Sequence, residues 1–472
     1  MYFFIFLYFF CYNLYNKVVI KVVKINIPDN IRLALEIIQT KGEAYIVGGC
    51  VRDNLLNIEP NDYDITTNLL PDEVIDLFGD YKIINNNGLK HGTVSIMIND
   101  QIIEVTTFRT EGSYLDGRHP SSVSFTKSLK EDLMRRDFTI NAMAYNDKVG
   151  LVDYYDGKSD LKNKIIRTVR DPYQRFEEDY LRILRALRFK SKLSFKIEDE
   201  TKKAMLVYAN NLVKISYERV FNELKTIMLA NEIDKLIIEF LPIFLVIFPE
   251  LSLTINFDQK SKWHSKKLFD HLIGVCVNTP CDLALRLAAL FHDIGKATCY
   301  QEEIVNGCII RHFAKHNEES TKITRKILER LKVPNELKEE VLFLVFYHDY
   351  AINSESSIKR ILIDIKDDKQ IYYFNKLLLL KKADYSDHTI YDEVDYDKYS
   401  KMAEDIVFNS KLIKIKDLAI NGYDLMELGY YRHQIKVILD SLIEEVNFNN
   451  LENKKDVLIN YINESSDKYE TN

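Results

Sequence analysis

The segment GGCVRDNLLNIEPNDYDITTN, residues 48–68, contains two adjacent glycines, an Arg-Asp pair and two aspartates on alternate positions. In a strand, residues i and i+2 face the same side, so Asp62 and Asp64 are expected to present their carboxylates together. Two negative charges this close repel each other, which predicts a cation between them. Carboxylate oxygens are hard ligands that suit Mg²⁺, an ion that also binds phosphate oxygens.

A third carboxylate is predicted from the strand-like segment QIIEVTTF, residues 101–108. Glu104 stands there between Ile103 and Val105, which we expect to face the core. Two Mg²⁺ ions at such a carboxylate set can activate an attacking hydroxyl and stabilise the leaving oxygen. For the two aspartates taken alone, a solvated strand edge followed by a turn is an equally good interpretation.

The glycine pair and the helix-like VRDNLL that follows it predict an anion site. Gly48 and Gly49 have no side chains, so the backbone can approach a triphosphate closely. N–H groups near the start of the helix would face the phosphates.

Beyond this segment, strand-like and helix-like pieces alternate to about Asp147, and from about Pro172 onward the pattern is almost wholly helical, including residues 177–193. The predicted fold class is α+β, with a small α/β head followed by a mostly helical body. We expect a head, a helical neck, a second helical domain and a helical tail, with the bounds 25–150, 151–235, 236–390 and 391–472.

The totals restrict the functional classes. A net charge of −7 argues weakly against a general nucleic-acid coat protein but leaves room for a local basic groove. Six cysteines without a CxxC pair indicate a reduced, cytoplasmic setting. Residues 1–24 lack a basic start and a cleavage site, and their apolar run is too short for a membrane span, so we interpret them as an extension and expect no membrane partner.

The order of the glycines, the Arg-Asp pair, the two aspartates and the isolated glutamate resembles the nucleotidyltransferase superfamily of DNA polymerase beta. Later motifs narrow the resemblance to the bacterial CCA-adding enzymes, or class II tRNA nucleotidyltransferases, from about Ala44 to Leu229. They are TTFRTEGSYLDGRHPSSVSF (106–125), EDLMRRDFTINAMAY (131–145), DPYQRFEEDYLRILRALRF (171–189) and SYERVFNELKTIM (216–228).

This resemblance implies addition of CCA to the tRNA 3′ end from CTP and ATP with Mg²⁺, and no DNA partner. It implies catalytic roles for Asp62, Asp64 and Glu104. Arg135 and Arg136 also suit triphosphate oxygens because a guanidinium matches phosphate geometry. The resemblance assigns nucleotide contacts to Gly48, Gly49, Arg52, Arg136, Asp137, Asn141, Asp179, Arg182, Arg185 and Arg188.

Asp179 and Arg182 are three residues apart and are expected on one face of a helix. An Asp accepts from an amino group and an Arg donates to ring nitrogen and carbonyl, so the pair can read the edge of cytosine or, with a small tilt, adenine. Uracil and guanine present the wrong order of donors and acceptors. Without the family context, an exposed ion pair within the helix is the simpler interpretation.

The sequence leaves open both the nucleotides that are added and the class of protein. NAMAY (141–145) and the stretch 109–120, with Tyr114, Arg118 and Pro120, favour full CCA addition over an A-adding enzyme or poly(A) polymerase. An HD phosphohydrolase with a vestigial head is the alternative from another class, and a binding-only RNA chaperone is a third.

The string LRLAALFHDIGKA (285–297) resembles the HD phosphohydrolase superfamily. Imidazole and carboxylate groups suit a second divalent metal, and the alternative is a degenerate helical domain that serves packing or RNA contact. The resemblance implies the ligands His271, His292, Asp293 and Asp384, with His316 and His348 as extra candidates.

Overall fold

The structure is a computed structural model that describes residues 24–85, 88–112, 122–261, 265–388, 394–409, 412–448 and 451–465. The predicted N-terminal extension therefore lies almost wholly outside the described residues, as do Tyr114, Arg118 and Pro120. The chain forms two compact units that divide after Glu223, and each is described by itself. No helix among the described residues is both long and apolar enough to span a membrane.

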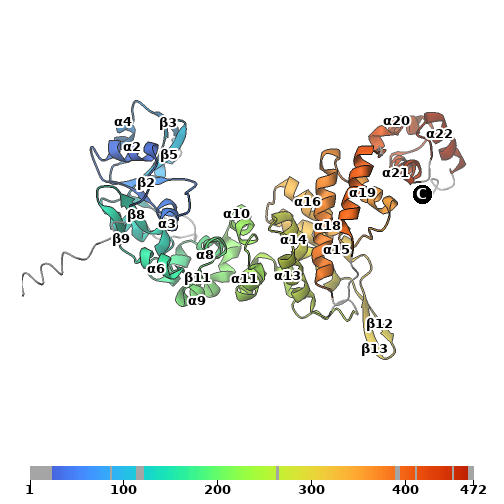
Figure 1. Cartoon of the computed structure of the whole chain (residues 1–472), viewed down its shortest axis with the longest axis horizontal. Coiled ribbons are helices and arrows are strands. Elements are labelled where there is room, and N and C mark those ends of the chain that lie inside the picture. Colours follow the sequence, from blue (N-terminus) through green and yellow to red (C-terminus); the bar gives the residue numbers. More distant parts are fainter. Residues whose placement is uncertain are drawn as a thin grey trace, which may run out of the picture. The chain divides into compact units, whose positions relative to one another are not determined.

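The first unit is built on a mixed seven-stranded sheet with the order β3-β4-β5-β2-β1-β8-β9 (Figure 1). Only β2 and β5 pair in parallel; the other neighbours are antiparallel. The strands are β1 (Ala44–Val47), β2 (Asp64–Thr67), β3 (Lys82–Asn85), β4 (Thr93–Ile98), β5 (Gln101–Thr107), β8 (Met143–Asn146) and β9 (Gly150–Asp153).

Helices and short strands complete this unit. Its shorter strands pair as β6 (Arg109–Glu111) with β7 (Val123–Phe125) and as β10 (Ile165–Ile166) with β11 (Lys196–Ile197). The helices are α2 (Asp29–Ile38), α3 (Gly49–Leu55), α4 (Pro71–Leu77), α5 (Leu129–Met134), α6 (Gly157–Asn163), α7 (Pro172–Glu178), α8 (Leu181–Leu193) and α9 (Asp199–Tyr208), followed by α10 (Tyr217–Ile227), which runs across the division.

The core of the sheet explains where the site lies. β1 is buried at all four residues, and Ile65, Ile103 and Val105 are fully buried on the neighbouring strands. The alternation of β5 therefore leaves Glu104 exposed between two core residues, as predicted. Gly48 ends β1 and leads directly into α3.

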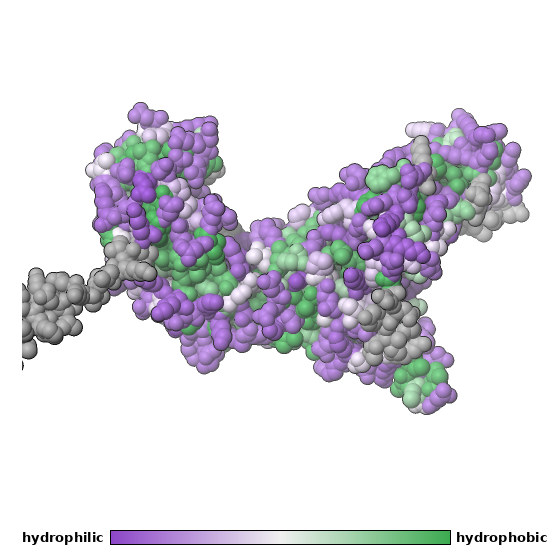
Figure 2. Space-filling model, in the orientation of Figure 1, coloured by the Kyte–Doolittle hydropathy of each residue, from purple (hydrophilic) through white to green (hydrophobic). Residues whose placement is uncertain are grey.

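The second unit is helical apart from one hairpin, β12 (Gln301–Val305) with β13 (Cys308–His312). The prediction of an almost wholly helical body did not locate this hairpin, although Asn306-Gly307 next to β-branched residues is a hairpin-turn signal. Figure 2 shows apolar surface at its tip, where Ile304 and Ile309 are exposed.

The helices of this unit surround buried cores. They are α11 (Ile233–Glu239), α12 (Leu241–Ile247), α13 (Leu268–Asn278), α14 (Leu283–Phe291), α15 (His316–Arg330), α16 (Asn335–Tyr347), α17 (Glu355–Ile363), α18 (Gln370–Ser386), α19 (Tyr396–Asn409), α20 (Gly422–Glu427), α21 (Arg432–Phe448) and α22 (Lys455–Glu464). The last three enclose a cluster of their own around Leu425, Ile438, Leu442 and Leu458.

Two local expectations need correction. β2 begins at Asp64, so Asp62 lies just before the strand rather than within it. The helix expected over residues 177–193 is interrupted, because α7 ends at Glu178 and α8 begins at Leu181. Asp179 has extended backbone dihedrals (φ −146°, ψ 105°) and lies just before Tyr180, the N-cap of α8, so it does not share the face of that helix. Its Oδ1 accepts a hydrogen bond from the N–H of Leu181, the first residue of α8.

Candidate functional site

A polar cavity of about 730 Å³ lies in the first unit. It is lined by both of the predicted metal-binding aspartates and by all ten predicted nucleotide contacts. Its charged lining residues are Arg52, Asp53, Asp62, Asp64, Arg109, Arg135, Arg136, Asp137, Asp179, Arg182, Arg185, Arg188, Lys192 and Arg219. Cationic side chains outnumber anionic ones, which suits a polyanionic ligand.

Asp62 and Asp64 line this cavity, whereas Glu104 is not among its lining residues. Asp64 is the direct register partner of Glu104 across the parallel pair β2 and β5, and like charges at that position destabilise a sheet. Partial desolvation raises the pKa of Asp64, as do the charges of Asp62 and Glu104, while Arg136 opposes the rise. These acceptor-only groups fit a hard divalent cation, which would relieve their repulsion.

Gly48 needs to be glycine for two separate reasons. Its φ is +83° with ψ −127°, a conformation that side chains disfavour, and an added Cβ would lie 2.9 Å from Nη1 of Arg136. The turn from β1 into α3 and the approach of Arg136 to it thus both depend on the missing side chain.

Gly48→Ala is expected to destabilise the fold by about 1–3 kcal/mol and to slow nucleotide addition, because Arg136 must move. Thermal unfolding and incorporation rates measure the two effects. Gly49→Ala is the matched control for stability, since its Cβ would meet only Arg52, at 3.7 Å. Equal losses of stability in the two variants would contradict this explanation.

Arg135 and Arg136 share a buried carboxylate that the sequence analysis missed. Nε of Arg135 donates to Oδ1 of Asp132 at 3.0 Å, and Nη2 of Arg136 lies 3.5 Å from Oδ2 of Asp132. Burial would raise the pKa of Asp132, but the two guanidinium groups outweigh it and lower this pKa. Asp132 therefore stays ionised and anchors both arginines at the cavity wall.

A second hydrogen-bond network joins further residues that line the cavity. Nε of Arg185 donates to Oδ2 of Asp137 at 2.7 Å, and the amide of Asn141 donates to Oδ1 of Asp137 at 3.2 Å. Arg52 donates to Asn141 Oδ1 at 2.6 Å and to Asp53 Oδ1 at 2.8 Å. Burial would raise the pKa of Asp137, but the ion pair with Arg185 lowers it to about 2.

The structure gives Asp179 and Arg182 separate partners. Nη2 of Arg219 donates to Oδ2 of Asp179 at 2.9 Å, while Nη1 of Arg182 donates to Oε2 of Glu178 at 2.5 Å and to the carbonyl of Arg175 at 2.8 Å. Arg182 is only 8% exposed, which contradicts the alternative of an exposed ion pair on a helix surface. Arg219 was missed because tertiary packing creates its contact with Asp179, 40 residues away. Glu178 was missed although its i,i+4 spacing from Arg182 is a usable signal.

Arg188 is a further arginine that lines the cavity. Its Nε lies 2.6 Å from Oε2 of Glu223, and its guanidinium lies 4.7 Å from the ring centroid of Phe189. Burial lowers the pKa of Arg188, with Glu223 opposing, and the group remains a cation.

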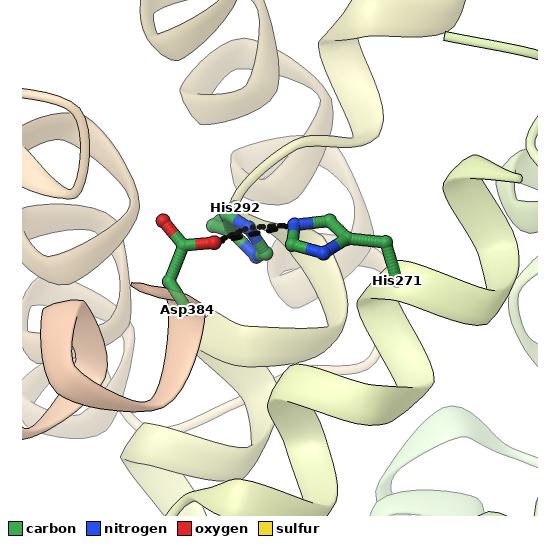
Figure 3. Close-up of side chains that lie close together, drawn as sticks. All are labelled: His271, His292 and Asp384. Atoms are coloured by element: carbon green, nitrogen blue, oxygen red, sulfur yellow. Dashed lines mark hydrogen bonds and ion pairs between the residues drawn. The ribbon is translucent and has the colours of Figure 1, made fainter. Parts of the chain in front are cut away.

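A separate cluster in the second unit gathers every predicted HD ligand. Nε2 of His271 lies 3.3 Å from Nε2 of His292 and 3.2 Å from Oδ1 of Asp384 (Figure 3). On the other side of Asp293, Nε2 of His316 and Nε2 of His348 are 3.1 Å apart. Asp293 spans the two halves, with Oδ2 3.5 Å from His292 and Oδ1 3.2 Å from His348.

The outer nitrogens of these imidazoles fix their tautomers. Nδ1 of His292, His316 and His348 faces a backbone carbonyl at 2.7–2.8 Å, and Nδ1 of His271 faces Asp387 Oδ2 at 3.0 Å. These oxygens only accept, so each Nδ1 donates and a neutral ring leaves the inner Nε2 with a lone pair. Lone pairs facing each other at this distance fit divalent cations.

Asp387 was missed by the sequence analysis, although its i+3 spacing from Asp384 on the same helix run is a usable signal. Burial would raise the pKa of the Asp293 carboxyl, but Lys296, whose Nζ lies 2.5 Å from Oδ2, and the surrounding imidazoles hold it well below its usual range.

Three family models match the chain. They are the poly A polymerase head domain over residues 44–167, the "probable RNA and SrmB-binding site of polymerase A" over 194–253, and the HD domain over 273–387. The first unit therefore carries a nucleotidyltransferase head, and the second carries an HD domain, as the resemblances implied.

Relatives with curated names are similar over part of their length. The CCA-adding enzyme of Pediococcus pentosaceus is 47% identical over 207 residues, 43% of this chain and 51% of the relative. That of Ligilactobacillus salivarius is 41% identical over 244 residues, 49% of this chain and 60% of the relative. The chain thus aligns with about half the length of the curated relatives it matches.

Solved structures are similar to a larger part of the chain than the curated relatives are. The Bacillus stearothermophilus CCA-adding enzyme in complex with CTP has a TM-score of 0.65 at 26% identity, covering 94% of this chain and all of that one. A Thermotoga maritima CCA-adding enzyme complexed with tRNA has a TM-score of 0.54 at 20% identity, covering 94% and 97%, and shares the fold.

Proposed function

We propose that this chain, which is similar to CCA-adding enzymes in sequence and in fold, is a cytoplasmic tRNA nucleotidyltransferase that builds or repairs the 3′-terminal CCA from CTP and ATP. The observation that carries the proposal is the single cavity lined by the metal-type aspartates, the arginine walls and the base-reading pair. The proposed bounds assign transfer to 25–150, base recognition to 151–235, hydrolysis to 236–390 and further RNA contact to the tail, 391–472.

In the proposed reaction the terminal 3′-hydroxyl of tRNA attacks the α-phosphate and pyrophosphate leaves. Asp62 and Asp64, with Glu104 as a less central third carboxylate, would hold Mg²⁺, which when bound supplies an activated hydroxyl and a counter-charge for the leaving oxygen. Gly48 and Gly49 allow the triphosphate to approach the backbone. Arg136, anchored by Asp132, donates to phosphate oxygens.

Base selection is assigned to the far end of the cavity. Asp179 accepts from the exocyclic amino group of cytosine or adenine, and Arg182 donates to the ring nitrogen beside it. Asp137 and Asn141 hold Arg185 and Arg52 in place, so we assign these four residues to shaping the nucleotide site, with Arg188 as a further contact.

Incorporation of labelled CTP and ATP into tRNA that ends before, within or after CCA tests this function. Full CCA addition predicts two C and one A on tRNA lacking the whole terminus. Incorporation of A alone would identify an A-adding enzyme or poly(A) polymerase. If no nucleotide is incorporated and hydrolysis survives Asp62→Ala, the chain is a phosphohydrolase with a vestigial head. If the chain shows neither incorporation nor hydrolysis, the binding-only RNA chaperone is the remaining alternative.

The HD cluster supports a second candidate activity, metal-dependent phosphoester hydrolysis. Its inner Nε2 atoms and the carboxylates of Asp293 and Asp384 would hold divalent cations such as Mn²⁺, Ni²⁺ or Zn²⁺, which when bound supply a hydroxide nucleophile at neutral pH. The tautomers enforced at Nδ1 orient these ligands whether or not substrate is present.

The double variant His292→Ala, Asp293→Ala is expected to lose any metal-dependent hydrolysis and to leave nucleotide addition largely unchanged. Metal content after dialysis against Mn²⁺ gives a second readout, in which the variant should retain less metal than the parent. His312→Ala is the matched control, because His312 is exposed and pairs with Glu303 on the hairpin, away from the cluster. Loss of CCA addition in a well-folded double variant would contradict the separation of the two sites.

A further inference from the structure

Both oxygens of the Asp179 carboxylate already have protein donors. Oδ1 accepts from the N–H of Leu181 at 3.0 Å, which ties the carboxylate to the first turn of α8, and Oδ2 accepts from Nη2 of Arg219 at 2.9 Å. Because each oxygen has two lone pairs, each keeps one free for a ligand. The orientation of the free lone pairs is therefore set jointly by α8 and by Arg219 on α10.

Arg219 lies at the cavity itself. It is one of the cavity-lining residues, together with Asp179 and Arg182. Its Nη1 is buried and has no hydrogen-bond partner within the described part of the chain. One end of this guanidinium therefore holds Asp179, while the other end has donors that the protein does not use.

The ion pair between Arg219 and Asp179 affects which bases the cavity can accept. Cytosine and adenine present an amino donor where uracil and guanine present a carbonyl acceptor. A fixed Asp179 accepts from the amino group and repels the carbonyl. A free guanidinium at the same place would do the reverse, since it only donates. Discrimination therefore requires that Asp179 face the base and that Arg219 stay behind it.

We propose that Arg219 is a positioning residue for base selection: its ion pair holds Asp179 toward the base and keeps its own donors away from the base edge. The proposal rests on the proposed function, because it needs Asp179 to read the nucleotide. It adds a residue 40 positions from Asp179 to the device that selects CTP and ATP over UTP and GTP.

The test measures kcat/KM for all four nucleotides on one tRNA acceptor, together with thermal unfolding. Arg219→Ala is expected to lower the CTP-to-UTP and ATP-to-GTP ratios by about tenfold or more, the value of about one charge-assisted hydrogen bond. Arg219→Lys, which can still donate to Oδ2, should recover part of the preference. Lys225→Ala, an exposed cation on the same helix, should leave both ratios unchanged.

A double-variant cycle separates this role from simple support of the fold. UTP efficiency should be higher in Asp179→Ala, where Arg219 is released, than in Asp179→Ala, Arg219→Ala. Equal loss for all four nucleotides in Arg219→Ala, or equal UTP use in the single and double Asp179 variants, would overturn the proposal. A parent protein that adds neither C nor A to any tRNA acceptor would instead overturn the proposed function.

Discussion

Asp64→Ala is expected to reduce CTP and ATP incorporation by at least about a thousandfold, the equivalent of about 4 kcal/mol of transition-state stabilisation. Asp62→Ala should act similarly. The physical reason is that these carboxylates are the proposed ligands of the cation that balances charge at the α-phosphate. Asp64 faces Glu104 across the parallel strand pair, so a single loss leaves an incomplete ligand set.

Stability should not follow activity in these variants. Asp64 is repelled by two carboxylates, so its removal relieves like-charge repulsion, and the midpoint of thermal unfolding should stay the same or rise slightly. Asp64→Asn keeps the shape and removes the charge, and it should be nearly as inactive as alanine. Asp80→Ala, an exposed carboxylate outside the cavity, is the control. Near-normal incorporation in Asp62→Ala or Asp64→Ala would contradict the proposal that these residues hold Mg²⁺.

The carboxylate set was predictable because its determinants are local. The alternation of β5 requires Glu104 to face away from Ile103 and Val105, and the glycine turn fixes where α3 starts. Only the beginning of β2 differed, which moves Asp62 just outside the strand. The HD ligands were predicted from chain order, and the structure gathers all six residues into one buried cluster, while their role as metal ligands stays a prediction.

The arrangement of Asp179 and Arg182 was harder to predict, because it depends on how the junction of α7 and α8 packs. Apolar residues recur at helical spacing through Tyr180, so periodicity gave no sign of the break between α7 and α8. The usable signal was Asp179 itself, since an Asp side chain can accept from the backbone N–H two residues later and so favours a turn over a continuous helix. The partner of Asp179, Arg219, is set by a long-range contact that no spacing rule gives, whereas Glu178 lies at the i,i+4 spacing from Arg182 that a spacing rule does give.

Arg182→Ala is the second large prediction, with an expected loss of about five- to more than a hundredfold in kcat/KM for CTP and ATP and a smaller loss for UTP and GTP. A bidentate contact to a base edge is worth about 1–3 kcal/mol of discrimination. Cytosine and adenine accept from the donors of Arg182, and uracil and guanine do not. Removing these donors therefore narrows the preference for CTP and ATP over UTP and GTP. Measuring all four nucleotides on one tRNA acceptor gives the ratios directly.

Because Arg182 is buried, the ratio of CTP to UTP efficiency, rather than the absolute rate, decides whether Arg182 reads the base. Because Arg182 is nearly buried and paired with Glu178, Arg182→Ala will also cost stability, and a general loss of activity would be uninformative. Glu178→Gln separates the two effects, since it keeps the guanidinium and weakens one of its anchors. We expect it to narrow the preference less than Arg182→Ala does.

Two comparisons decide whether Arg182 reads the base. Lys190→Ala removes a cation from the same helix outside the cavity and should leave the CTP-to-UTP ratio unchanged. If Arg182→Ala retains activity with the parental ratio, the residue only steadies the junction of α7 and α8. If the ratio falls more in Arg182→Ala than in Glu178→Gln, weakened anchoring of the guanidinium does not account for the change, and the guanidinium itself contributes to base selection.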